Sequence, residues 1–316
     1  MRYKIFGKTG MEISVVSAGT WGAGGSGWGQ ADRAACVGAL RTMLENGVNL
    51  IDTAPAYGKG YAEELVAEAI RGTAREKVLL STKGGLKIDI PGGGISKIAT
   101  RSEMIDGCEA SLRRLGTDYI DILFVHWPDV NTPVGETMDA MNELKAQGKI
   151  RHIGLSNFSV GQMEEAARYA EIGAIQPPYS MVEQSALGIM KWAETQNIGC
   201  MTYASLGAGI LGGKIRELTD FGRGDVRGGF YDYFKEPKFS KVMQLLEVMD
   251  DIADNRGVTH AQIAINWVVQ KSYAHTALTG VRTSAHAADN CGAAEWTLSA
   301  NDMQLLDAKA GLLFGV

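Results

Sequence analysis

Residues 48–57 of this chain read Val-Asn-Leu-Ile-Asp-Thr-Ala-Pro-Ala-Tyr, so a short apolar run ends at Asp52 and Tyr57 follows five residues later. Two later apolar runs lead in the same way to Lys83 and His126. Each run is short and is followed by a helical pattern, which predicts a buried strand. Polar side chains at the C-terminal ends of parallel strands are typical of the active site of a (β/α)8 barrel.

Strands and helical segments alternate over the whole chain. Candidate strands lie at residues 13–18, 49–53, 78–82, 120–125, 150–155, 174–176, 199–203 and 276–279. Helical patterns lie at residues 33–46, 61–72, 102–115, 133–147, 159–170, 186–196, 240–256 with 259–270, and 284–293. This alternation predicts a parallel sheet with right-handed crossovers, and eight units predict that the sheet closes. We therefore expect an α/β fold, a (β/α)8 TIM barrel, in a single domain over residues 1–316.

Two segments depart from the strand–helix repeat. Residues 7–10, Gly-Lys-Thr-Gly, separate two short runs and predict the turn of an N-terminal β-hairpin, which we expect to plug the bottom of the barrel. Residues 206–240 follow the seventh candidate strand and are rich in glycine. Barrel enzymes often have a lid or a phosphate-binding loop at that place.

The composition excludes several classes of protein. A net charge of -5 without a long run of Lys or Arg argues against binding to nucleic acid or to an anionic membrane. The N-terminus lacks the apolar core of a signal peptide, and no apolar stretch approaches the roughly 20 residues that span a bilayer. We therefore expect a cytoplasmic protein. The cysteines lack CxxC spacing and are expected to be buried free thiols; they are Cys36, Cys108, Cys200 and Cys291.

The four polar side chains can together pass a proton to a carbonyl oxygen. A phenol such as Tyr57 supplies that proton if its pKa is drawn below its usual value of about 10. We expect Lys83 to lower this pKa by favouring the phenolate, and Asp52 to neutralise and orient the lysine. We expect His126 to position the substrate at the same oxygen.

Three of these four residues also have a simpler interpretation. Asp52 can cap the following helix, Lys83 can be a solvated strand end, and His126 can be a packed loop residue. Four complementary groups at the ends of three successive strands favour a shared site instead. A metal-dependent hydrolase would need a cluster of His and carboxylate ligands at strand ends. Only His126 occupies such a place, so we expect no metal.

Longer motifs around these residues resemble those of the aldo-keto reductases, nearly from end to end. The motifs are residues 19–22, 52–60, 81–83, 125–127 and 148–158, Tyr203 with Ser205-Leu206, and residues 280–282 through 289–290. The resemblance implies that Asp52, Tyr57, Lys83 and His126 form a catalytic tetrad with Tyr57 as general acid or base. The chain looks most like bacterial reductases related to inositol-utilisation and aldehyde-reducing enzymes, and it is also similar to potassium-channel β-subunits.

The resemblance also implies a nicotinamide cofactor. Ser156, Asn157 and Gln176 would hold the amide, and Tyr203 would stack beneath the ring, which fixes the face that meets the substrate. The other implied contacts are Trp21, Ser205, Leu206, Gly209 and Leu211 around the ring and pyrophosphate, and Gly280, Arg282, His286, Asp289 and Asn290 around the adenosine end. Backbone N–H groups of a glycine-rich loop suit a pyrophosphate.

The choice of cofactor depends on positive charge near the adenosine. His286 stands where the family often has Gln or Arg, and a neutral histidine cannot make the bidentate contact that arginine makes with a 2′-phosphate. We expect Arg282 to compensate, with Lys214 and Arg216 as further candidates. NADP(H) is therefore the expected cofactor, and NAD(H) is the second option.

Aromatic residues are expected to form the substrate slot above the nicotinamide. Trp21 and Trp127, with Tyr57 and His126, are the expected substrate contacts, and Tyr231 or Tyr233 can add a wall. The expected substrate is a small carbonyl compound or alcohol: an aldehyde, sugar, polyol or inositol-type ketone. The alternative function is a nicotinamide-binding redox sensor or regulatory subunit with slow turnover. The sequence indicates no oligomeric state.

Overall fold

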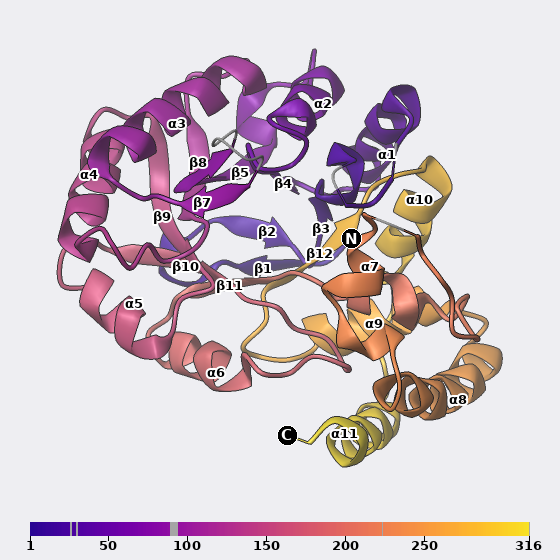
Figure 1. The fold of residues 1–316 in the computed structure, drawn as a ribbon. Coiled ribbons are helices and arrows are strands. Elements are labelled where there is room, and N and C mark those ends of the chain that lie inside the picture. The colour runs from indigo at the N-terminus through magenta and orange to yellow at the C-terminus, as the bar shows by residue number, and fades with distance from the viewer. Residues whose placement is uncertain (26, 30, 89–93, 223, 316) are drawn as a thin grey trace.

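A closed ring of eight parallel strands forms the centre of the described structure (Figure 1). The computed structural model describes residues 1–25, 27–29, 31–88, 94–222 and 224–315. The ring closes between its last and first strands, because β12 pairs with β3 through Ala277 and Val16. In chain order its strands are β3 (Val16–Gly19), β4 (Leu50–Asp52), β5 (Leu79–Gly84), β8 (Ile120–Val125), β9 (Ile150–Ser156), β10 (Ile172–Gln176), β11 (Gly199–Thr202) and β12 (Thr276–Gly280).

Helices surround the ring of strands (Figure 1). Most begin at a Ser, Thr or Asp whose side chain accepts a hydrogen bond from the first helical turn, for example Asp32 and Thr100. The helices are α1 (Arg33–Glu45), α2 (Tyr61–Ala69), α3 (Arg101–Leu115), α4 (Val134–Ala146), α5 (Val160–Ala166), α6 (Leu187–Thr195), α7 (Val226–Gly229), α8 (Lys238–Arg256), α9 (His260–Val269), α10 (Ser284–Gly292) and α11 (Ala300–Phe314). The predicted (β/α)8 barrel is therefore confirmed.

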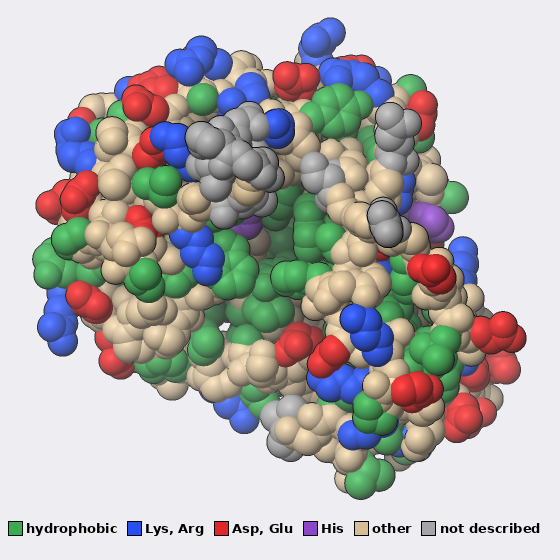
Figure 2. Space-filling model, in the orientation of Figure 1, with side chains coloured by type: hydrophobic (Ala, Val, Ile, Leu, Met, Phe, Trp, Pro, Cys, Tyr) green, Lys and Arg blue, Asp and Glu red, His purple; other side chains and the backbone are tan. Residues whose placement is uncertain are grey.

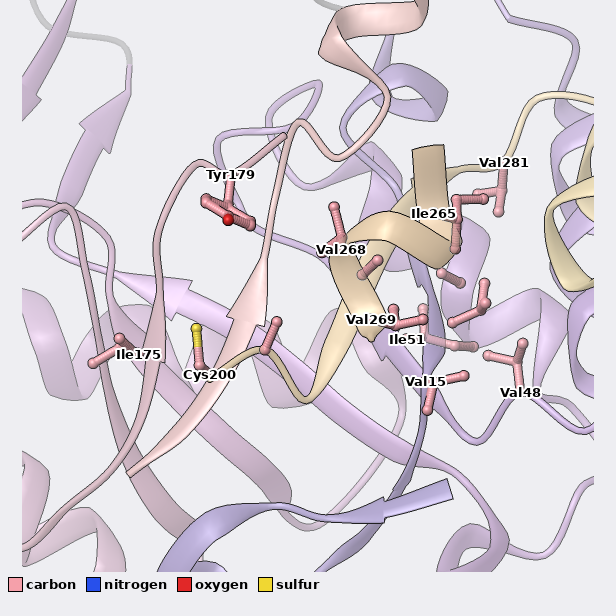
Figure 3. Packing of buried hydrophobic residues seen from close by; sticks show 14 of the residues in the cluster. Val15, Val48, Ile51, Ile175, Tyr179, Cys200, Ile265, Val268, Val269 and Val281 are labelled. Carbon is pink, nitrogen blue, oxygen red and sulfur yellow. The ribbon is translucent and has the colours of Figure 1, made fainter. Parts of the chain in front are cut away.

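The layer between barrel and helices is apolar. In Figure 3, Ile265 and Val269 project from α9 toward the side of the barrel that carries Val15 and Ile51, and all four side chains are almost fully buried. Residues four apart lie on the same face of a helix, so this spacing turns one stripe of α9 onto the strands. Each of the four cysteines is a buried free thiol, as predicted.

The N-terminal hairpin plugs one end of the barrel. Strands β1 (Tyr3–Ile5) and β2 (Glu12–Ser14) pair in antiparallel fashion. Phe6 follows β1, is completely buried, and packs in one cluster with inward-facing barrel residues such as Phe124 and Met201. A Cβ atom at Gly199 would lie 2.6 Å from the Phe6 ring, so β11 needs glycine where the ring enters. The predicted hairpin and its plugging role are thus both present.

Side chains of the hairpin also bind the C-terminal third of the chain. The Arg2 guanidinium donates hydrogen bonds to Asn266 Oδ1 at 2.8 Å and to the Ala294 carbonyl at 3.1 Å. Lys4 Nζ donates to the Val269 carbonyl at 2.6 Å. These bonds join residues more than 260 positions apart in sequence, so they fasten the N-terminal hairpin to α9 and the segment after it.

The predicted strand at residues 13–18 begins too early. The chain bends at Val15, so residues 12–14 belong to the hairpin and the barrel strand β3 begins at Val16. The structure contains a second hairpin after β5, which the sequence pattern does not predict. Its strands, β6 (Leu86–Ile88) and β7 (Ile95–Lys97), are three residues each and are separated by glycine-rich sequence, which gives no alternating pattern.

Three further differences concern the helices. Helix α5 ends at Ala166, before the predicted end at residue 170. Helix α11 lies beyond the last predicted helix and packs against α8. Residues 206–240, predicted as one long loop, contain a short 3-10 segment at Gly207–Gly212, helix α7 and a further turn at Asp232–Phe234.

Among the described residues, no helix has both the length and the apolar character needed to cross a membrane.

Candidate active site

The four predicted tetrad residues meet at the C-terminal ends of three neighbouring strands. Asp52 ends β4, Lys83 lies near the end of β5, and His126 directly follows β8, while Tyr57 lies in the turn between β4 and α2. Strands β4, β5 and β8 are adjacent in the barrel. Figure 2 shows a hollow on the face in view whose walls are mainly hydrophobic.

Asp52 and Lys83 form a buried ion pair. Lys83 Nζ lies 2.7 Å from Asp52 Oδ2 and also donates to the Thr53 carbonyl at 2.9 Å. The other carboxylate oxygen of Asp52 accepts hydrogen bonds from Ser81 Oγ at 2.7 Å and from Gln176 Nε2 at 2.9 Å. Both charged side chains are about 2% exposed, so this set of hydrogen bonds offsets the cost of removing two charges from water.

The Tyr57 ring faces both Lys83 and His126. Lys83 Nζ lies 4.9 Å from the centre of the Tyr57 ring. The His126 ring meets it edge-on, with centroids 6.1 Å apart and an angle of 85°. A Cβ atom at Gly24 would lie 2.9 Å from Tyr57 Cβ, so the loop after β3 can approach the tyrosine only with glycine there. The tyrosine is therefore enclosed by three separate segments.

Burial controls the protonation of the site. Burial raises the pKa of Tyr57 well above 10, and the negative charge of Asp52 raises it further. Burial lowers the pKa of Lys83, and Asp52 opposes this effect. Burial and the positive charge of Lys83 hold the pKa of His126 well below 6.5. The pKa of Tyr57 is therefore raised overall, because burial and Asp52 dominate, and the phenol stays protonated at neutral pH. That Lys83 favours the phenolate stays a prediction.

A chain of hydrogen bonds joins the residues predicted to hold a nicotinamide amide. Tyr203 Oη donates to Asn157 Oδ1 at 3.0 Å, and Asn157 Nδ2 donates to Ser156 Oγ at 3.0 Å and to the His126 carbonyl at 2.9 Å. Ser156 Oγ donates in turn to the Gln176 carbonyl at 2.9 Å. Asn157 has a φ of 63°, a left-handed conformation that directs its amide into this chain.

The segment after β11 turns sharply and repeatedly. Four of its residues have positive φ angles, namely Ala204, Gly207, Ala208 and Gly209. The φ angle is 54° at Gly207 and 96° at Gly209. Successive residues that alternate between left- and right-handed conformations turn backbone N–H groups into a concave surface that suits anions. The predicted pyrophosphate contacts lie on this segment. Ser205 and Leu211 are buried, Leu206 is partly exposed and Gly209 is exposed.

The residues predicted to surround the adenosine lie at the start of α10 and on its faces. Arg282 donates a hydrogen bond to the Trp28 carbonyl at 3.0 Å, which ties it to the loop after β3. Asp289 accepts from Gln262 Nε2 at 2.8 Å and from Thr259. Asn290 is 4% exposed and donates to the carbonyl of Gly280, the last residue of β12, at 3.4 Å, and His286 is exposed on the first turn.

Arg216 lies elsewhere. Its guanidinium pairs with Asp250 at 2.5 Å, and His260 Nε2 lies 2.6 Å from the same carboxylate. The structure therefore commits Arg216 to a contact between the 206–240 segment and helices α8 and α9. Its suggested role toward a 2′-phosphate has no support in this arrangement, whereas Arg282 lies beside the loop after β3.

Aromatic rings line the mouth of the site. Trp21 stacks over Tyr57 with ring centroids 6.3 Å apart, and it meets Trp28 and Phe230 edge-on at 5.4 and 6.3 Å. Tyr231 is 8% exposed and its ring meets that of Phe230 edge-on with centroids 4.9 Å apart, which places it at the same wall. Trp28 and Phe230 are not in the sequence prediction, because neither follows a strand directly.

Trp127 directly follows His126 and contacts the hairpin after β5. Lys97 Nζ, from the hairpin after β5, lies 4.2 Å from the centre of the Trp127 ring. Tyr233 is 2% exposed and packs against Tyr231 and Phe234, so it supports the wall and does not line it.

In the part of the chain that the structure describes, no three His, Cys, Asp or Glu side chains are arranged to hold a metal ion.

Comparison with known proteins identifies this arrangement. Residues 15–310 match the sequence profile of the aldo/keto reductase family. The chain belongs to the aldo/keto reductase family. As a member of that family it is an NAD(P)-dependent oxidoreductase that acts on carbonyl compounds. The family resemblance predicted from the sequence is thereby confirmed.

Several aldo/keto reductase relatives match over nearly the full chain. Aldo-keto reductase YhdN of Bacillus subtilis is 37% identical, and the match covers 96% of this chain and 92% of the relative. The NADH-specific methylglyoxal reductase of Escherichia coli is 31% identical, with 97% and 98% covered. A probable voltage-gated potassium channel subunit beta of Arabidopsis thaliana is 32% identical, with 93% and 92% covered. Among solved structures, a glycerol dehydrogenase from Gluconobacter oxydans is 31% identical, covers 96% of this chain and 93% of its own, and superposes with a TM-score of 0.87.

Two contacts of this aldo/keto reductase site escape sequence reasoning. Gln176 donates its amide to Asp52, and Ser81 donates its hydroxyl to the same carboxylate. Gln176 is predicted as a nicotinamide contact, and its partner lies 124 residues away in sequence. Ser81 belongs to a matching motif, and the inward alternation of β5 already places it on the same face as Lys83. That alternation is the signal that could have identified it.

Proposed function

We propose that this protein transfers hydride between a nicotinamide nucleotide and a small carbonyl compound or alcohol, with Tyr57 as the proton donor and acceptor. The observation that carries the proposal is the position of Lys83, whose ammonium lies 2.7 Å from Asp52 and 4.9 Å from the Tyr57 ring at the C-terminal end of the barrel. Proton transfer to a carbonyl oxygen needs a protonated phenol, a charge that stabilises its conjugate base and a group that positions the substrate, and the closeness of Tyr57, Lys83 and His126 supports the proposal.

The residues around the site fit a nicotinamide nucleotide. When bound, its C4 atom supplies or accepts the hydride. Ser156, Asn157 and Gln176 bring hydroxyl and amide groups together on one side of the site, and Tyr203 is held by its hydroxyl to Asn157, which fixes the plane of its ring. The concave backbone after β11, with Ser205, Leu206, Gly209 and Leu211, suits the pyrophosphate. Arg282 and Asn290 are proposed to contact the adenosine end.

Tyr57 holds the proton that a substrate oxygen receives during reduction. As the phenol gives up that proton, the Lys83 ammonium stabilises the phenolate, and the Asp52 carboxylate keeps the lysine oriented toward the ring. The neutral His126 ring can donate one N–H to the substrate oxygen and so position it beside Tyr57. Trp21 and Trp127 form apolar walls that exclude water from this point.

The two directions of the reaction are expected to respond differently to pH. Reduction needs a protonated Tyr57 and a neutral His126, so its kcat should stay nearly constant from about pH 6.5 to 9, because one pKa lies well below and the other well above that range. Oxidation needs a base, so its kcat should rise with pH over the same range. Initial rates in both directions with one substrate pair test this. A reduction rate that halves near pH 6.5 would contradict a neutral His126.

The first experiment is a survey of NADPH and NADH oxidation by absorbance with purified protein. Relatives named for methylglyoxal and for glycerol make methylglyoxal the first reduction substrate and glycerol the first oxidation substrate. Aldehydes, ketoses and inosose-type ketones complete the panel. Turnover with any of them supports the proposal and names the substrate class. Binding of cofactor without turnover in either direction would reject it.

We also propose that NADP(H) is preferred, because Arg282 brings a planar guanidinium to the adenosine end. Replacing Arg282 by Ala should weaken NADPH binding about tenfold or more and NADH binding less than twofold, since only NADPH carries the 2′-phosphate. Tryptophan fluorescence titration measures both affinities. Arg216→Ala is the matched control and should change neither, because Asp250 holds that side chain. Equal weakening of both cofactors by Arg282→Ala would place the 2′-phosphate contact elsewhere.

A redox-sensing or regulatory role is the second candidate, and the 32% identical potassium-channel relative is the observation that favours it. A sensor retains its cofactor and turns over slowly, whereas a metabolic reductase releases it in each cycle. Stopped-flow measurement of cofactor release beside steady-state kcat separates the two. Release much slower than about 1 s⁻¹ with every substrate would favour the sensor.

A further inference from the structure

Helix α2 buries a carboxylate directly behind the active site. Glu63 is completely buried and lies in the first turn of the helix. Its Oε1 accepts a hydrogen bond from Thr82 Oγ1 at 2.7 Å, and its Oε2 pairs with Arg114 Nε at 2.5 Å. Arg114 extends from α3 and is 28% exposed. One carboxylate therefore connects three elements, namely α2, β5 and α3.

On β5, Glu63 binds Thr82, the residue directly before Lys83. Side chains along β5 alternate between the inside and the outside of the barrel. Ser81 and Lys83 point inward and both bind Asp52, whereas Thr82 points outward and binds Glu63. The hydrogen bond from Thr82 thus fixes the backbone of β5 at the point where Lys83 leaves it.

The helix contact places Glu63 close to the tyrosine as well. Tyr57 lies in a compact turn that leads into α2, and the backbone N–H of Ala62 donates to the Tyr57 carbonyl at 3.2 Å. At Gly60, the residue before the helix, φ is +90° and a Cβ atom would lie 2.5 Å from Arg114 Cδ. Arg114 therefore packs directly against the end of the turn. The same ion pair braces the segments that carry Lys83 and Tyr57.

The negative charge of Glu63 also favours the protonated form of Lys83. The titratable groups on the inner side of β5 near Lys83 are Asp52 from β4, Tyr57 from the turn and His126 after β8. Glu63 from α2 acts on Lys83 from the outer side of the strand. Burial lowers the pKa of Lys83, and the negative charge of Glu63 opposes that effect together with Asp52. Loss of the Glu63 charge should therefore make Lys83 easier to deprotonate.

We propose that Glu63 is a positioning residue of this active site, which by joining Thr82 to Arg114 holds Lys83 at its working distance from Tyr57. The inference rests on the proposed reduction chemistry, because the distance matters only if Lys83 stabilises the Tyr57 phenolate. Glu63 itself does not reach the reacting atoms, since its carboxylate lies on the outer side of β5.

Thr82→Val and Glu63→Gln test the proposal by kinetics. Thr82→Val removes only the hydroxyl, and Glu63→Gln removes only the charge. Each should lower kcat about tenfold, because displacement of a catalytic group by a fraction of an ångström costs rate. KM for the carbonyl and Kd for the cofactor should change less than twofold, since neither ligand touches Glu63. Glu68→Gln changes a partly exposed carboxylate of the same helix that pairs with Arg33 and should leave kcat unchanged.

A stability measurement separates positioning from general loss of structure. The double variant Glu63→Gln with Arg114→Gln removes both charges and should recover most of the Tm that Glu63→Gln loses. If Glu63 positions Lys83, kcat should stay low in the double variant, and its decline at alkaline pH should begin at a lower pH than in wild type. Recovery of kcat together with Tm would show a purely structural role and overturn the proposal.

A structural measurement keeps the inference testable without turnover. Crystal structures of wild type and Thr82→Val should differ by about 0.5 Å or more in the distance from Lys83 Nζ to the Tyr57 ring. An unchanged distance would overturn the positioning role even if the enzyme is active. Absence of turnover in wild type with a changed distance would instead reject the proposed reaction and leave the brace itself established.

Discussion

Replacing Tyr57 by Phe should lower kcat for carbonyl reduction by about 10² to 10⁴, because the loss of a positioned proton donor costs that much in general acid catalysis. The ring and its stacking against Trp21 remain, so cofactor Kd should change less than twofold. Burial keeps the phenol protonated at neutral pH, so the wild type has the donor ready and the variant has none. Absorbance assays of NADPH oxidation at saturating carbonyl measure the difference.

A matched control for this variant is Tyr273→Phe. Tyr273 Oη lies 2.8 Å from Tyr179 Oη, outside the candidate site, so its loss removes a phenol hydroxyl from the same protein without touching Lys83 or His126. We expect kcat to be unchanged there. A Tyr57→Phe variant that retains wild-type kcat would remove Tyr57 from the mechanism and leave His126 as the proton donor.

Replacing Lys83 by Met should have the second large effect, on both stability and rate. The variant leaves the Asp52 carboxylate buried without its counter-ion, which costs about 3–5 kcal/mol in the free energy of unfolding. Ser81 and Gln176 still donate to Asp52, which favours the lower end of this range. Loss of the ammonium should also lower kcat by about 10² or more, since the phenolate of Tyr57 loses its stabilising charge. Urea unfolding and steady-state kinetics measure the two effects.

The double variant Asp52→Asn with Lys83→Met separates these effects. It removes both buried charges, so stability should return to within about 1–2 kcal/mol of wild type. Activity should not return, because the ammonium is still absent. A Lys83→Met variant of full stability would mean that Asp52 is protonated in the folded state, and would contradict the ion pair.

Much of the barrel could be predicted because its strands are short apolar runs that alternate with amphipathic helices. The strands that carry Asp52, Lys83 and His126 agree with the prediction to within one or two residues. The hairpin after β5 could not be predicted, since three-residue strands joined by glycines carry no periodic signal. The break at Val15 was hidden because two strands with different partners are contiguous in sequence.

The candidate site shows a similar division. The tetrad could be located because Asp52, Lys83 and His126 lie at or just after the ends of strands and Tyr57 follows Asp52 by five residues. Its chemical roles stay predictions until the variants above are measured. The bond from Gln176 to Asp52 and the contact between Trp21 and Phe230 depend on closure of the ring and on the path of a long segment. The burial of Glu63 is equally hidden, because an acidic residue in the first turn of a helix is common on a solvated surface.

The hydrogen bonds from Arg2 and Lys4 to the last third of the chain affect how the protein is made. During synthesis the hairpin leaves the ribosome well before its partners around residues 266–294, which appear only after more than 250 further residues have been translated. Until then β3 presents an unpaired edge, which is a site for aggregation. Nascent chains stalled before β12 should therefore bind chaperones, and release should coincide with synthesis of β12 and residues 266–294.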